Sequence, residues 1–132
     1  MELEARQLFK HAKPFGGFSA DDIPKAKDFY EGTLGLEVTE TNGMLSLQLD
    51  PDTAVLVYPK PDHVPAAFTI LNFPVTNIDE AVDALTERGV RFETYDEGDL
   101  KTDERGIARD IGPGIAWFRD PAGNILSVIE AD

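Results

Sequence analysis

The amino-acid sequence predicts an α+β protein in which two tandem βαβββ modules form an eight-stranded, cupped mixed sheet with a central cavity. The first observation is that the order strand, helix, strand, strand, strand occurs twice, over about residues 14–60 and about residues 66–131. The second is a constant offset of 55 between the two stretches, which pairs Asp22 with Asn77. Because each module is an open sheet with one covering helix, two modules complete each other's sheets around a shared concavity. We therefore expect a single domain spanning residues 1–132.

The first module follows an N-terminal arm, residues 1–14, for which the sequence indicates no definite structure. Residues 15–20 (FGGFSA) indicate a strand that leads into a helix ended by Gly35. Asp22 caps this helix, and Pro24 is suited to its first turn. One side of the helix is apolar at helical spacing, through Ile23, Ala26, Phe29, Tyr30 and Leu34.

Three short strands complete the first module. They are predicted at residues 36–41, 44–50 and 53–59. An Asn-Gly dipeptide separates the first two, and this pair between alternating segments is a strong signal for a two-residue hairpin turn. A Pro-Asp dipeptide marks the turn before the third strand.

The second module repeats this order after a linker at residues 60–66 that contains two prolines. A strand is predicted at residues 67–75 and a helix at residues 77–89. Asn77 is the N-cap of this helix, and Glu80 occupies the capping-box position. The apolar side of the helix consists of Ile78, Ala81, Val82 and Leu85. The remaining strands are predicted at residues 90–95, 114–120 and 124–130.

The charge of the chain disfavours two classes of partner. With 25 acidic and 12 basic residues the formal net charge is -13, which repels nucleic-acid phosphates and anionic lipid surfaces. We therefore expect no nucleic acid and no membrane as a partner. A solvated acidic surface is the main explanation of this charge, and attraction of a cationic ligand is the weaker alternative.

Composition also bounds the chemistry and the compartment. The chain has no cysteine, which excludes disulfides, thiolate metal sites and cysteine nucleophiles. The N-terminus lacks the apolar core of a signal peptide, and no apolar run approaches the roughly 18 residues that a membrane span needs. A cytoplasmic location is the default expectation.

Three motifs resemble those of one superfamily. DDIPKAKDFYEGTLGL, NIDEAVDALTERGVRF and WFRDPAGNILSV are similar to motifs of the vicinal oxygen chelate superfamily, and together they cover nearly all of residues 15–130. This superfamily includes glyoxalase I, extradiol dioxygenases, fosfomycin resistance enzymes and bleomycin resistance proteins. The resemblance implies one glyoxalase/bleomycin-resistance-like domain, a VOC domain, that forms a homodimer.

The resemblance also implies four metal-ligand positions. The superfamily's enzymes bind a divalent metal there through His and carboxylate side chains, which leave sites open for a chelating substrate. Three of these positions hold Phe15, Ile70 and Ser127 here. The fourth lies in the strand at residues 53–59, which contains no carboxylate. We therefore expect no metal site and no cofactor. His11, His63 and Glu130 are predicted to be solvated surface groups.

Alternation along the strands predicts which side chains line the cavity. The lining is apolar with a few hydrogen-bonding groups, as in small-molecule pockets. Tyr58 and Trp117 add stacking surfaces with a polar atom, with core or dimer packing as the alternative for Trp117. The predicted ligand-binding residues are Phe15, Ser19, Tyr58, Ile70, Asn72, Trp117 and Ser127.

One long loop and the serine side chains are the remaining candidates for chemistry. The charged, glycine-containing segment 96–114 is either a lid over the cavity or a mobile loop without function. On a lid, Arg105 and Arg109 would contact an anionic ligand, and the alternative is that both are solvated. Ser19 and the other serines have no histidine near them in sequence, so no nucleophile constellation is predicted and no catalytic residue is assigned.

The leading hypothesis is a metal-independent protein that binds a small amphipathic molecule, with a cationic one weakly favoured, similar to bleomycin resistance proteins. The second is a glyoxalase-like lyase or dioxygenase-like metalloenzyme with atypical ligands. The third is a protein-interaction module whose cavity is filled by its own side chains. The sequence leaves the ligand's identity open, and also whether any reaction is catalysed.

Overall fold

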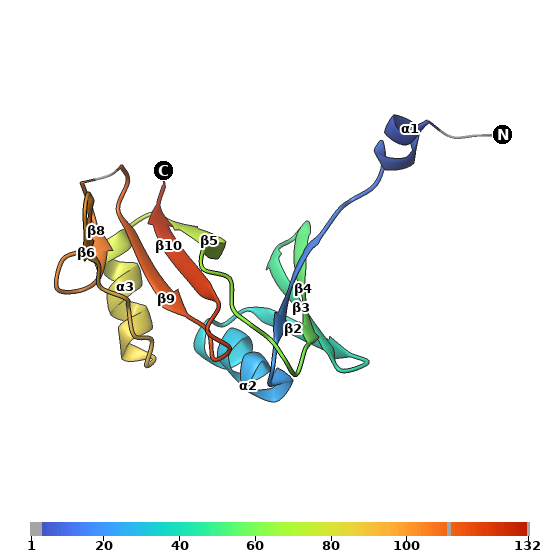
Figure 1. Ribbon diagram of the computed structural model, residues 1–132, viewed down its shortest axis with the longest axis horizontal. Helices are drawn as coiled ribbons and strands as arrows, with labels where there is room; N and C mark the ends of the chain where they lie inside the picture. The colour runs from blue at the N-terminus through green and yellow to red at the C-terminus, as the bar shows by residue number, and fades with distance from the viewer. Residues whose placement is uncertain (1–3, 111, 132) are drawn as a thin grey trace.

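The computed structural model describes residues 4–110 and 112–131 (Figure 1). The first module contains β1 (Gly16–Ala20), α2 (Ile23–Lys27), the π-helical turn η1 (Asp28–Thr33), β2 (Glu37–Thr41), β3 (Met44–Asp50) and β4 (Thr53–Pro59). Its sheet has the order β1-β4-β3-β2, with β1 parallel to β4 and the other pairs antiparallel. The predicted cap is confirmed, because the Asp22 carboxylate accepts a hydrogen bond from the Lys25 amide at 3.1 Å.

Local sequence explains this sheet. Asn42 and Gly43 both have positive φ, 54° and 76°, as a tight turn between antiparallel strands requires, and the predicted hairpin is confirmed. In β3, Leu45 and Leu47 are buried, while Ser46 between them lies on the opposite side and is half-buried. This alternation gives the sheet one core-facing side and one open side.

The second module contains β5 (Thr69–Val75), α3 (Ile78–Glu87), β8 (Ile107–Ala108), β9 (Ile115–Arg119) and β10 (Ile125–Glu130), in the sheet order β5-β10-β9-β8. As predicted, the Asn77 side chain caps α3 by accepting from the Glu80 amide at 3.0 Å. Glu130 is exposed, in agreement with the prediction of a solvated carboxylate. Its Oε2 accepts from the Ile78 amide at 2.9 Å, so it caps the same helix.

Residues 90–95 do not form the predicted strand. Only an isolated bridge joins Phe92 to Phe118 of β9, and the chain then turns through the small hairpin of β6 (Asp96–Glu97) and β7 (Leu100–Lys101). Two segments pair with the same edge of β9. The bridge from Phe92 contacts Phe118, and β8 pairs antiparallel with the beginning of β9. A two-residue strand thus holds the position that the sequence assigned to residues 90–95.

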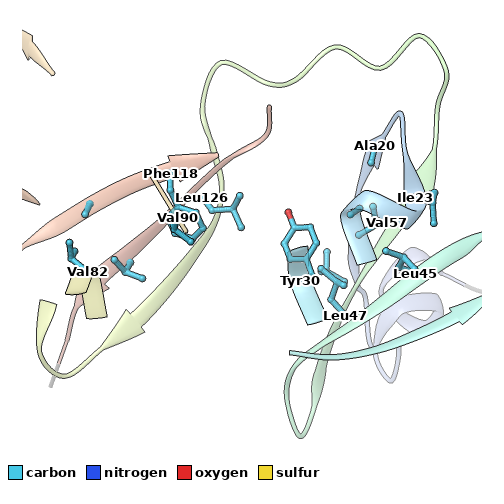
Figure 2. Packing of buried hydrophobic residues seen from close by; sticks show 14 of the residues in the cluster. Ala20, Ile23, Tyr30, Leu45, Leu47, Val57, Val82, Val90, Phe118 and Leu126 are labelled. Atoms are coloured by element: carbon cyan, nitrogen blue, oxygen red, sulfur yellow. The ribbon is translucent and has the colours of Figure 1, made fainter. Parts of the chain in front are cut away.

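The two modules meet in one hydrophobic core. Phe29 and Tyr30 of η1 reach the second module, where the ring centroids of Phe29 and Phe118 are 6.3 Å apart. Figure 2 shows buried side chains from both modules, including Leu47 of the first and Leu126 of the second. The core-facing sides of both sheets belong to this cluster, so each sheet keeps an open side directed away from it.

The α+β class with two βαβββ modules is confirmed. The eight module strands are divided between two four-stranded sheets, and in the part of the chain that the structure describes no pairing joins β1 to β5. We call the open side of the first sheet face A, defined by Ser19, Ser46 and Tyr58. The open side of the second sheet, defined by Asn72, Trp117 and Ser127, is face B.

The N-terminal arm projects away from both sheets (Figure 1). It carries the short helix α1 (Ala5–Phe9), which has no buried residue, and Phe9 is 71% exposed. None of the helices in the described ranges is long and apolar enough to cross a membrane.

Candidate ligand-binding site

A cleft of about 570 Å³ lies between the two modules. Its walls are β1, parts of β3 and β4, the linker at residues 63–68 and the beginning of β5. The walls are mostly apolar, with a small number of hydrogen-bonding side chains. Both the volume and the composition are those of small-molecule sites, which measure roughly 300–1,000 Å³.

A hydrogen-bonded chain forms the polar part of the cleft. Ser19 Oγ lies 2.6 Å from His63 Nδ1, and His63 Nε2 lies 3.1 Å from the carbonyl oxygen of Ala122. The Asn124 side-chain amide donates to the carbonyl of Ser19 at 3.1 Å. The prediction that His63 is a solvated surface group is therefore wrong, since both of its ring nitrogens have partners.

Three of the predicted ligand-binding residues line this cleft, namely Ser19, Tyr58 and Ile70. Tyr58 lies opposite Ser19 in the pairing of β1 with β4, which places both on face A, and it is 40% exposed. Its ring is thus available to a ligand as a stacking surface.

Three other predicted residues lie together on face B. Ser127 is buried and its hydroxyl donates to Asn72 Oδ1 at 2.5 Å, and Trp117 lies opposite Ser127 in the pairing of β9 with β10. Trp117 Nε1 donates to Thr69 Oγ1 at 3.1 Å, and the Tyr95 ring packs edge-on against the indole at 5.6 Å. Sequence reasoning missed Tyr95 and Thr69, because the facing of residues around Trp117 had no anchor.

The seventh predicted residue, Phe15, belongs to neither group. It is 69% exposed and borders a separate hollow with Lys13, Ser46 and Leu56 at the base of the N-terminal arm. Within one chain, the predicted set is therefore distributed over the cleft, face B and this hollow.

The turn at residues 120–124 positions the polar end of the cleft. Asp120 is buried, and its Oδ1 accepts from the amides of Ala122 and Asn124 at 2.9 Å each. Its Oδ2 accepts from the Tyr30 hydroxyl at 2.6 Å. Burial raises the pKa of Tyr30, and the charge and hydrogen bond of Asp120 add to this. The expectation that this turn is structural is confirmed.

Residues 10–128 match the model of the Glyoxalase/Bleomycin resistance protein/Dioxygenase superfamily. The chain belongs to this superfamily. No curated protein matches the chain.

Several solved structures have the same fold. A member from Sphaerobacter thermophilus is 26% identical with a TM-score of 0.64, and covers 91% of this chain and 98% of its own. The glyoxalase family protein from Enterococcus faecalis is 24% identical with a TM-score of 0.68, covering 92% and 99%. TnmS3, an antibiotic-binding protein from a Streptomyces species, is 22% identical with a TM-score of 0.62, covering 92% and 98%.

The positions that the resemblance predicts for metal ligands hold no imidazole or carboxylate side chain. Phe15 and Ile70 are apolar, and the Ser127 hydroxyl is hydrogen-bonded to Asn72. Across residues 4–110 and 112–131, no group of three or more His, Cys, Asp or Glu side chains is arranged to hold a metal ion. Imidazole and carboxylate ligands, which divalent metals of this kind require, are thus not gathered on either open face of the described chain.

In this superfamily member, residues 105–109 lie against α3. Arg105 donates to Asp79 Oδ1 at 2.6 Å and to Asp83 Oδ1 at 2.5 Å, and Arg109 donates to Asp79 at 2.7 Å. Hydrogen bonds from Arg109 and Arg105 lower the pKa of the Asp79 carboxyl. Both arginines remain partly exposed, as the alternative of solvated charges predicted, and their guanidinium groups are bound to the helix.

Proposed function

We propose that this protein binds a small amphipathic molecule in the cleft between its modules without using a metal, as bleomycin resistance proteins do. The observation that carries the proposal is the cleft itself, which combines apolar walls with polar side chains of fixed position. The antibiotic-binding neighbour supports this class of function. We include in the proposal that the two modules act as one domain, 1–132, in the cytoplasm.

The distribution of groups in the cleft supports an amphipathic ligand. Ser19, His63 and Asn124 form its polar end, whereas Val64, Phe68 and Ile70 supply apolar surface. None of the described lining residues is Asp, Glu, Lys or Arg. A cationic ligand would therefore be favoured through the faces of Tyr58 and Phe68 and through the acidic field of the whole chain, and not through an ion pair.

We propose further that the protein is a homodimer. Phe9, Phe15 and Phe68 are each about 70% exposed, and a second copy would cover such apolar surface. Residues 5–15 of the arm carry three basic and no acidic side chains on an otherwise acidic chain, so the arm is complementary in charge to a second copy. Face B of one copy would then supply Asn72, Trp117 and Ser127 opposite face A of the other, which would unite the predicted set.

Ligand screening tests the binding proposal. Trp117 is the only tryptophan, so its fluorescence reports binding near face B, and calorimetry reports binding anywhere. With a panel of neutral and cationic amphipathic antibiotics, we expect saturable binding that Tyr58→Ala weakens about tenfold or more. Lys101→Ala, an exposed change on β7, is the control and should leave the affinity unchanged. Equal loss in both variants, or no binding by any compound in the panel, would count against the proposal.

Elemental analysis tests metal independence. We expect less than stoichiometric Ni, Zn, Fe or Mn in the purified protein after dialysis, with ligand affinity unchanged by chelators. Stoichiometric metal that resists dialysis would instead support a glyoxalase-like lyase or a dioxygenase with atypical ligands. Light scattering at several concentrations gives the mass in solution, for which we expect two chains.

A further inference from the structure

We propose that Ser19 and His63 form a nucleophile and general-base pair that attacks carboxylic ester groups of molecules in the cleft. The proposal goes beyond binding, and it rests on the proposed function only in that an ester must enter this cleft. Ser19 Oγ and His63 Nδ1 are 2.6 Å apart, which is within the range of activated serine nucleophiles. Both side chains line the cleft.

The partners of the imidazole fix the direction of proton transfer. Its Nε2 lies 3.1 Å from the carbonyl oxygen of Ala122, which accepts hydrogen bonds but cannot donate them. Nε2 of the neutral ring therefore carries the proton, and Nδ1 has a free lone pair for the hydroxyl proton of Ser19. The same carbonyl stabilises the imidazolium that forms when this proton is transferred. The nucleophile Ser19, the base His63 and the orienting carbonyl of Ala122 thus form one chain of hydrogen bonds.

The pair is held by three separate segments of the chain. Ser19 belongs to β1, His63 to the linker, and Ala122 to the turn at 120–124, which the buried Asp120 organises. The linker packs on this turn closely enough that a Cβ added to Gly123 would lie 3.2 Å from Pro65 Cγ. A base oriented by surrounding structure in this way is preorganised for reaction.

The edge of β1 supplies donors for a developing oxyanion. In the described chain, β1 pairs with β4 only, so its other edge is free. The Ser19 carbonyl accepts from Asn124 on that free edge. Because the N–H and C=O of one strand residue point to the same edge, the amides of Ser19 and Gly17 also point there. Backbone amides beside the nucleophile are the usual donors to the oxyanion in acyl transfer.

The reaction balances without a further cofactor. Ser19 Oγ bonds to the ester carbonyl carbon while its proton moves to His63 Nδ1. The bond from carbonyl carbon to ester oxygen then breaks, and the leaving alkoxide takes that proton, which gives an acyl-serine and an alcohol. Water attacks the acyl-serine as His63 accepts its proton, and the proton returns to Ser19 Oγ as the carboxylic acid is released. One ester and one water thus yield one acid and one alcohol.

A cysteine replacement tests base activation without any ligand. The chain has no cysteine, so Ser19→Cys introduces a single thiol beside His63. We expect its alkylation by iodoacetamide to show a midpoint at least about one pH unit below the ordinary thiol value of roughly 8.5. In Ser19→Cys/His63→Gln the midpoint should return to the ordinary value. Ser46→Cys, on face A, is the matched control with no histidine partner in the described chain.

Charged side chains other than His63 offer no alternative cause for a lowered thiol midpoint at position 19. No described residue of the cleft walls is Asp, Glu, Lys or Arg. In the linker, Lys60 and Asp62 pair with each other at 2.7 Å, and the Asp120 carboxylate is bonded to Tyr30 and to its own turn. A midpoint of Ser19→Cys equal to that of Ser46→Cys would overturn the proposal, whether or not the protein binds any antibiotic.

Labelling of the unaltered protein is the second test and needs no change at Ser19. A small alkyl fluorophosphonate should form a phosphorus–oxygen bond at Ser19 Oγ as fluoride leaves, and peptide mass spectrometry locates the adduct. We expect His63→Gln to slow labelling about 100-fold or more while its circular dichroism stays that of the parent. No adduct on Ser19, or labelling that is independent of His63, would show that the pair only fastens the linker to β1.

Discussion

The hydroxyl of Tyr30 donates a 2.6 Å hydrogen bond to Oδ2 of Asp120, and this contact joins two residues 90 positions apart in the chain. Tyr30 lies on η1 of the first module, and Asp120 opens the turn that orients Asn124 and Ala122 at the cleft. The bond therefore connects the core between the modules to the polar end of the candidate site.

Tyr30→Phe should lower the free energy of unfolding by about 1–3 kcal/mol, because it leaves a buried carboxylate without one of its donors. Urea denaturation measures this change. Tyr58→Phe is the matched control, since that ring is partly exposed, and we expect it to change stability by less than about 0.5 kcal/mol. A Tyr30→Phe protein as stable as the parent would mean that water replaces the lost donor.

Alkaline pH should destabilise the protein through the same residue. Burial raises the pKa of Tyr30 above its ordinary value of 10.0, so above this pH the unfolded chain loses a proton that the folded chain keeps. The free energy of unfolding then falls as pH rises, by about 1.4 kcal/mol per unit for one such group. We expect Tyr30→Phe to remove this part of the slope between pH 10 and 11. Tyr95→Phe should remove a smaller part, because its pKa is also raised by burial, though it is less enclosed.

Gly106→Ala should be strongly destabilising. A Cβ at this position would lie 2.8 Å from the Glu93 carbonyl oxygen, and the residue has a φ of 88°. Gly98→Ala is the control, because φ there is 58° but nothing lies within 4 Å. We expect about 1–2 kcal/mol for Gly98→Ala and at least about 2 kcal/mol more for Gly106→Ala in thermal unfolding. Equal effects would indicate that the chain at residue 93 shifts to make room.

Arg105→Ala should release residues 103–109 from α3. The arginine holds Asp79 and Asp83 together, and its loss should increase hydrogen exchange at the amides of residues 103–108 while ligand binding in the cleft is unchanged. Arg6→Ala, on the projecting arm, is the control with no expected effect there. A loss of ligand affinity in Arg105→Ala would support the alternative that this part of the chain acts as a lid.

Ser127→Glu should create no metal site. The other positions predicted for metal ligands would still supply no donor, because Ile70 is apolar and Phe15 lies beside another hollow. Calorimetry with Ni²⁺, Zn²⁺ and Mn²⁺ should show no stoichiometric binding, and the protein should be less stable because position 127 is buried. Metal uptake by this single variant would show that faces A and B lie closer together in solution than in one chain.

Much of the fold follows from local patterns. The strands at 44–50 and 53–59 have the predicted bounds, because turn residues delimit them and one side of each is buried. The caps at Asp22 and Asn77 were also predictable, since each needs only a side chain within three residues of the amide that it accepts from. The prediction of a strand at residues 90–95 was wrong, because strand pairing depends on which segment reaches the edge of β9. Residues 107–108 pair with part of that edge.

The site was less predictable. Alternation placed Ser19, Tyr58, Trp117 and Ser127 on open faces, but it could not show that the two faces belong to separate sheets within one chain. The contact of Ser19 with His63 spans 44 positions and depends on the path of a proline-containing linker, which no periodicity describes. The ion pairs of Arg105 were not predictable either, because its partners on α3 are more than 20 positions away.

The contact of Phe29 with Phe118 has a consequence for the speed of recognition. Since this packing fixes one module against the other, ligand binding in the cleft requires no hinge closure between the modules. We expect association rate constants that depend on diffusion and on the orientation of the incoming molecule. Differences in affinity among compounds should then arise mainly from their dissociation rate constants.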